Sequence, residues 1–154
     1  MRALFTTSDS LLSRLIRRQT GEDCSHAALG IGDVVIHMNL RGLQVEPVSQ
    51  FLQHSRVVHD APLQLEPHRA LAHIAKCFHA RYDVGALAYL GLRTILPILP
   101  RANLWQASGM YLCTEFLTSL LDGAEDHLTT PHQLYLRLVG GTAPTTAPQE
   151  PEVR

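Results

Sequence analysis

The chain has 154 residues, of which 45% are hydrophobic and 18% are charged. This length suits one domain with a sizeable core, and a formal net charge of -1 at pH 7 gives no electrostatic basis for binding nucleic acid. The three cysteines are an odd number without a CxxC motif, which argues against a disulfide framework and fits a reducing compartment.

The start of the chain shows no readable secretory signal, because Arg2 precedes only a short apolar run that polar residues interrupt from Thr6 onward. We therefore expect a cytoplasmic protein. The most apolar stretch, residues 84–99, contains Arg93 and Pro97 and is shorter than the roughly 20 apolar residues of a spanning helix. We expect no transmembrane segment, and we interpret residues 84–99 as buried structure, an interface or a lid.

The first predicted elements are a strand over residues 2–6 and a helix. Ser8 or Ser10 is placed to cap this helix, and Gly21 is placed to end it. Between them, four aliphatic side chains share one side and three arginines the other. The aliphatic residues are Leu11, Leu12, Leu15 and Ile16.

Residues 25–37 are predicted to form a β-hairpin. Two apolar runs flank Gly32-Asp33, and glycine at the first central position suits a type II′ turn. This register pairs Ala28 with His37 and places His26 and His37 diagonally on one face beside small residues. The opposite face is apolar and suits a core; it carries Ala27, Leu29, Ile31, Val34, Ile36 and Met38.

The middle of the chain predicts a strand over residues 43–46, a short helix over 47–53 and a strand over 56–59. Pro67 can open a further helix. The apolar spacing of that helix predicts a buried stripe, and its histidines are expected at the surface. The stripe consists of Leu71, Ile74, Ala75 and Phe78, and the histidines are His68, His73 and His79.

Two more helices are predicted towards the end of the chain. One covers residues 111–121 and ends at Asp122-Gly123. The other begins at Thr130, which has capping-box spacing to Gln133 and precedes a proline, and Gly140 closes it. Residues 1–141 then form the domain, and residues 142–154, rich in Thr, Ala, Pro and Glu, form a tail expected to be disordered.

Cys113 lies near the start of a predicted helix, where the helix dipole and a neighbouring imidazolium would lower its pKa and favour the thiolate. With a histidine on a strand and a second polar strand residue, it gives the arrangement of a papain-like thiol hydrolase. Cys113 would be the nucleophile, His26 the base and then the acid, and His37 the residue that orients His26. No metal or cofactor is required. The alternatives are a buried inert cysteine, or a zinc site of Cys24, His26, His37 and Cys113, which lacks the closely spaced ligand pairs typical of structural zinc.

At these motifs the chain resembles the circularly permuted NlpC-like branch of the papain-like cysteine hydrolases, the type that includes YiiX and, more distantly, the lecithin retinol acyltransferases. The matching segments begin at Ser13, Ser25, Val35, Tyr82, Tyr111 and Thr130, with the histidine ahead of the cysteine. Many YiiX-type members resemble one another in having a carboxylate where this chain has His37. In this chain Thr114 stands where a serine usually follows the cysteine.

The resemblance implies an α+β fold with a small antiparallel sheet, and we expect the Cys113 helix on the face that carries His26 and His37. It also implies hydrolysis of an amide bond, such as a cell-wall peptide, or of a lipid acyl bond, with Cys113, His26 and His37 as the site. A lipid acyltransferase or thioesterase of the same fold, and a silent binding or assembly protein, remain alternatives. Residues 84–99 could form an apolar lid beside Cys113.

Overall fold

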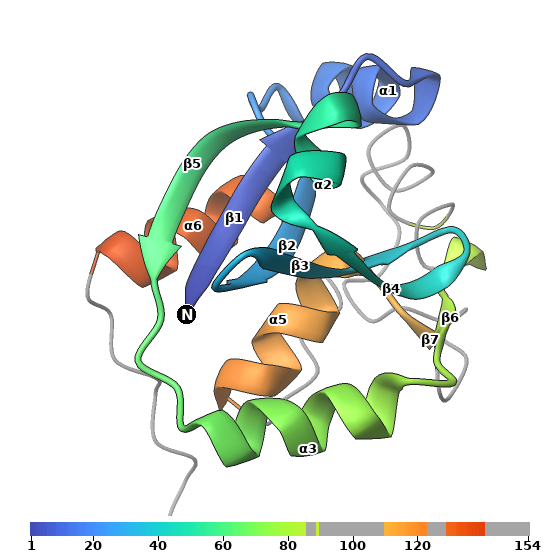
Figure 1. Ribbon diagram of the computed structural model, residues 1–154. Helices are drawn as coiled ribbons and strands as arrows, with labels where there is room; N and C mark the ends of the chain where they lie inside the picture. Colours follow the sequence, from blue (N-terminus) through green and yellow to red (C-terminus); the bar gives the residue numbers. More distant parts are fainter. Residues whose placement is uncertain (86–88, 90–109, 123–128, 141–154) are drawn as a thin grey trace, which may run out of the picture.

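The computed structural model describes residues 1–85, 89, 110–122 and 129–140 (Figure 1). The predicted tail and most of the predicted lid, residues 84–99, lie outside this part of the chain. The described residues form an α+β structure in which helices cover a small sheet. In this part, no helix has the length and hydropathy required to cross a membrane.

The main sheet has five antiparallel strands in the order β4-β3-β2-β1-β5. Its strands are β1 (Arg2–Thr7), β2 (His26–Ile31), β3 (Val34–Asn39), β4 (Gly42–Pro47) and β5 (Arg56–Pro62). A short parallel pair joins β6 (Arg81–Tyr82) to β7 (Met110–Tyr111). The helices are α1 (Leu11–Thr20), α2 (Val48–His54), α3 (Pro67–Cys77), α5 (Cys113–Asp122) and α6 (Pro131–Val139).

The predicted hairpin is confirmed with its register. Ile31 lies opposite Val34, and Ala28 lies opposite His37. Gly32 has a φ of 55°, whereas the φ of Asp33, like that of every other non-glycine residue in the described part of the chain, is not positive. This sign pattern matches a type II′ turn and excludes type I′. The two-residue turn therefore sets which side chains share each face of β2 and β3.

The two faces of the sheet are covered by different helices (Figure 1). The apolar face of β2 and β3 packs with Phe116 and Leu117 of α5 in the main core. The opposite face, which carries His26 and His37, packs against Phe51 of α2 in a second, smaller cluster. The expectation that the Cys113 helix packs on the histidine face is therefore wrong. The wide apolar stripe of α5 is buried against the apolar face instead, and Cys113 in its first turn lies near Ala27 of β2.

Helix α1 forms as predicted, but the side of the helix that is buried differs from the predicted one. The Ser10 side chain accepts a hydrogen bond from the Ser13 amide, and Gly21 ends the helix with a φ of 74°. Leu11 and Leu15 are 82% and 60% exposed, while Ser13 is buried. Ser13 faces inward because its hydroxyl is hydrogen-bonded to that of Ser25 at 2.6 Å. The predicted aliphatic stripe thus lies partly at the surface.

The predicted stripe of α3 is wrong for three of its four residues. Leu71, Ala75 and Phe78 are exposed, and only Ile74 is partly buried against the main core. The fully buried residues of α3 are the small Ala70 and Cys77. Small side chains allow α3 to approach α5 closely, where His73 lies 3.2 Å from the carbonyl oxygen of Phe116. His73 is therefore an interhelical hydrogen-bonding residue, whereas the other two histidines, His68 and His79, are exposed as expected.

The remaining boundaries follow the sequence signals closely. Helix α6 begins with the predicted capping box between Thr130 and Gln133 and ends at Gly140. Helix α5 begins at Cys113, two residues later than expected, because Tyr111 belongs to β7. Cys113 therefore occupies the first residue of a helix that is anchored in the core by Phe116 and Leu117.

Candidate active site

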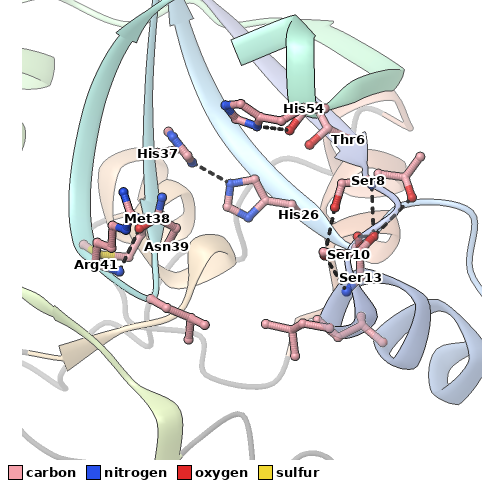
Figure 2. A pocket seen from close by; sticks show the side chains of 16 residues that line it. Thr6, Ser8, Ser10, Ser13, His26, His37, Met38, Asn39, Arg41 and His54 are labelled. Atoms are coloured by element: carbon pink, nitrogen blue, oxygen red, sulfur yellow. Dashed lines mark hydrogen bonds between the residues drawn. The ribbon is translucent and has the colours of Figure 1, made fainter. Parts of the chain in front are cut away.

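His26 and His37 come together through the hairpin register (Figure 2). Nε2 of His26 lies 3.0 Å from Nδ1 of His37, and the two rings meet nearly at right angles. His37 is buried, whereas His26, at the first position of β2, is partly exposed. The two imidazoles are therefore hydrogen-bonded to each other, as expected for a base and the residue that orients it.

Glu46 on β4 extends this pair, and the sequence interpretation did not find it. Its Oε1 lies 2.9 Å from Nε2 of His37, and its Oε2 lies 3.2 Å from Nε2 of His54. Glu46 pairs with Val35 in the sheet, two residues from His37, so both side chains share one face. The turn at Gly42 could have been used to pair β4 with β3 in the sequence, and this pairing would have placed Glu46 next to His37. The result is a chain of hydrogen bonds through His26, His37, Glu46 and His54.

The direction of these hydrogen bonds follows from charge. Burial lowers the pKa of His26 to about 3, and proximity to His37 and His54 acts in the same direction. Burial also lowers the pKa of His37, although Glu46 opposes this shift. Both imidazoles are thus neutral at pH 7. A neutral His37 must donate from Nε2 to the Glu46 carboxylate and accept at Nδ1 from His26 Nε2, which leaves Nδ1 of His26 as a free proton acceptor.

Cys113 is the first residue of α5 and lies near the start of β2, the strand that begins with His26. The backbone amides of Ala27, the residue after His26, of Thr114 and of Cys113 itself lie close enough to its sulfur to lower the pKa of the thiol. Among the described residues, no hydrogen bond joins the sulfur to His26 itself. Burial raises the pKa of the Cys113 thiol, and the nearby amides only partly oppose this effect. The expectation of a lowered pKa is therefore wrong, because the desolvation of a 6% exposed residue outweighs the helix start.

Labelling of Cys113 should report a neutral resting thiol. We expect iodoacetamide to alkylate it slowly at pH 6 and faster as the pH rises, without a plateau below pH 8, because its pKa lies above its ordinary value. Cys24, whose pKa burial raises to about 12, should react even more slowly. Peptide mapping after timed labelling of the folded protein measures both rates. A Cys113 rate that levels off near pH 6 would indicate a preformed thiolate instead.

A cavity of about 370 Å³ opens in front of His26 (Figure 2). One part of its wall is polar and carries hydroxyls, including those of Ser8, Ser10 and Ser13. Another part is apolar, formed by Leu12, Ile16, Met38 and Leu40. His37 also lines the cavity, but Cys113 is not among the described residues that do so. The proton-accepting histidine is thus reachable from solvent, while the thiol lies deeper.

The alternative zinc set is not assembled in the described part of the chain. Cys24 packs in the main apolar core with Ala27 and Leu29, whereas His26 and His37 lie on the other face of the sheet. A converging group of potential metal ligands does exist elsewhere, and it contains none of these four residues. Cys24 therefore acts as a small core residue.

Comparison of the chain with protein-family models gives no match, and a search of curated proteins finds no relative. What the protein does must therefore be inferred from the geometry of this site and from the resemblance of the motifs around His26 and Cys113.

Proposed function

We propose that the protein is a cysteine hydrolase of the circularly permuted, NlpC-like papain type. Cys113 is its nucleophile, His26 its base and then its acid, and His37 the positioning residue. The observation that supports this most is the hydrogen-bond order from Glu46 through His37 to His26, which leaves Nδ1 of His26 to accept a proton. The backbone amide of Ala27, the residue that follows His26, lies close enough to the Cys113 sulfur to lower the pKa of its thiol.

The reaction starts from a neutral thiol and a neutral imidazole. His26 takes the thiol proton while the sulfur attacks the carbonyl carbon of the substrate, which forms a tetrahedral intermediate. His26 then gives the proton to the leaving nitrogen or oxygen, and a thioester remains on Cys113. Water, deprotonated by the same histidine, hydrolyses the thioester and restores the thiol. The hydrogen bond to His37 holds the His26 ring in one orientation throughout.

The cavity wall favours an apolar acyl group over a purely polar peptide. Leu12 and Ile16 of α1 line it, and their neighbours Leu11 and Leu15 lie exposed on the same helix. Exposed aliphatic residues beside a cavity are typical of a surface that binds an apolar ligand. We therefore place a lipid-like acyl substrate first. A cell-wall peptide amide comes second, because the resemblance to the NlpC-like hydrolases also implies that substrate.

A series of p-nitrophenyl esters from acetate to decanoate tests this proposal. We expect kcat/KM to rise with chain length, by up to about 0.8 kcal/mol per methylene that becomes buried. Ile16→Ser should flatten the rise, because it removes part of the apolar wall. The matched control Leu71→Ser, on the exposed side of α3, should leave the series unchanged.

Two results would contradict the proposal at different levels. A flat ester series together with cleavage of cell-wall peptides would keep the thiol chemistry and reject the acyl preference. If neither esters nor cell-wall peptides are hydrolysed and neither acylates Cys113, the protein would instead be a binding or assembly protein that keeps this fold.

A further inference from the structure

A second group of titratable side chains lies away from the thiol, where three separate elements meet. Asp23 belongs to the loop between α1 and β2, His59 to β5 and His132 to the first turn of α6. Nε2 of His59 lies 2.7 Å from Oδ2 of Asp23, and Nδ1 of His132 lies 3.2 Å from Oδ1. The carboxylate is thus held between two imidazoles that come from distant parts of the chain.

The ligand atoms of these three residues converge. One nitrogen or oxygen from each lies within 4.8 Å of the other two. Atoms bound to one tetrahedral zinc ion at about 2.0–2.2 Å lie about 3.3–3.6 Å from each other. Side-chain rearrangements of about 1 Å would therefore bring all three onto one ion.

The surroundings hold the two imidazoles in place. The ring of His59 stacks on Tyr135 with centroids 4.3 Å apart and planes 11° apart. Thr130, which caps α6, also donates a hydrogen bond of 2.6 Å to Glu22, the neighbour of Asp23. The loop, the strand and the helix are therefore tied together before any ion binds, which lowers the entropy cost of binding.

The chemistry of the donor atoms also suits a transition-metal cation. Deprotonated imidazoles and a carboxylate are ligands of zinc and its first-row neighbours, whereas magnesium and calcium prefer sites made of oxygen atoms only.

We propose that Asp23, His59 and His132 bind one divalent first-row transition-metal ion, with zinc as the representative case. The ligands are a carboxylate oxygen of Asp23, Nε2 of His59 and Nδ1 of His132. Such an ion clamps β5 and α6 to the loop that enters β2 at His26. The site is separate from the thiol chemistry, so each can exist without the other.

Zinc binding to the tag-free, full-length chain tests this site by titration calorimetry. We expect one ion per chain, and at least about tenfold weaker binding in Asp23→Asn and in His59→Gln. His68→Gln, an exposed histidine on α3, is the matched control and should bind as the wild type does. Cys113→Ser should also bind normally, because its thiol is not a ligand.

Nitrogen NMR of the wild-type histidines provides a test that needs no variant. Addition of zinc should shift Nε2 of His59 and Nδ1 of His132, with the proton of each ring on the other nitrogen. Absence of zinc binding would overturn the proposal, and so would binding that survives both Asp23→Asn and His59→Gln. Binding that is lost in Cys113→Ser would place the ion at the thiol and equally reject this site.

Discussion

Replacing Cys113 by alanine should abolish hydrolysis of the p-nitrophenyl esters, and His26→Gln should lower kcat/KM by about 10²–10⁴-fold. The thiol forms the covalent intermediate, so its loss removes the pathway itself. Without His26 the thiol keeps its proton, because burial holds its pKa above the ordinary value and the variant has no base beside it. Steady-state kinetics on each purified variant, with circular dichroism to verify folding, measures both effects.

The exposed His68 is the control for this prediction. His68→Gln should hydrolyse the esters at the wild-type rate, because the residue lies on α3 outside the site. A Cys113→Ala variant that keeps a substantial part of the wild-type activity would exclude the thiol as nucleophile. The serine hydroxyls that line the same cavity would then be the next candidates.

His37 and Glu46 should matter less than His26, in the order of their distance from the reacting atoms. His37→Asn leaves nucleophile and base in place and should retain more activity than His26→Asn. Glu46→Gln keeps an oxygen that can accept from His37 but removes the charge, so its effect should be the smallest of the three. Because both residues act by positioning, kcat should fall while KM changes little.

Short-range signals made part of this site predictable from the sequence. Gly32-Asp33 sets the hairpin turn, and strict alternation on both sides of it brings His26 and His37 to one face. Capping chemistry likewise defined the start of α6 at Thr130. In each case residues that are neighbours in sequence determine the geometry.

The parts that escaped prediction depend on packing between distant segments. Glu46 reaches His37 only through the register of β4 on β3, and Asp23 meets His132 across 109 positions of sequence. The inward side of α1 depends on a hydroxyl contact with Ser25, which hydrophobic spacing does not report. The raised pKa of Cys113 follows from its burial, which is a property of the whole fold.

Phe51 of α2 connects the stability of the histidine face to its function. It is fully buried and packs edge-on against His37 at 5.2 Å and against His54 at 5.6 Å between ring centroids. It also forms the centre of the small apolar cluster with Ala28 and Val35.

Phe51→Ala should therefore lower the free energy of unfolding by about 3–5 kcal/mol, through lost burial and an unfilled cavity. Phe78→Ala is the matched control; because Phe78 is 66% exposed, its replacement should change stability by no more than about 0.5 kcal/mol. Urea denaturation of the three proteins gives these values. At temperatures where Phe51→Ala is still folded, its kcat should be reduced, since His37 and His54 lose the ring that supports them. A loss of stability no greater than that of Phe78→Ala would show that α2 does not anchor the histidine face.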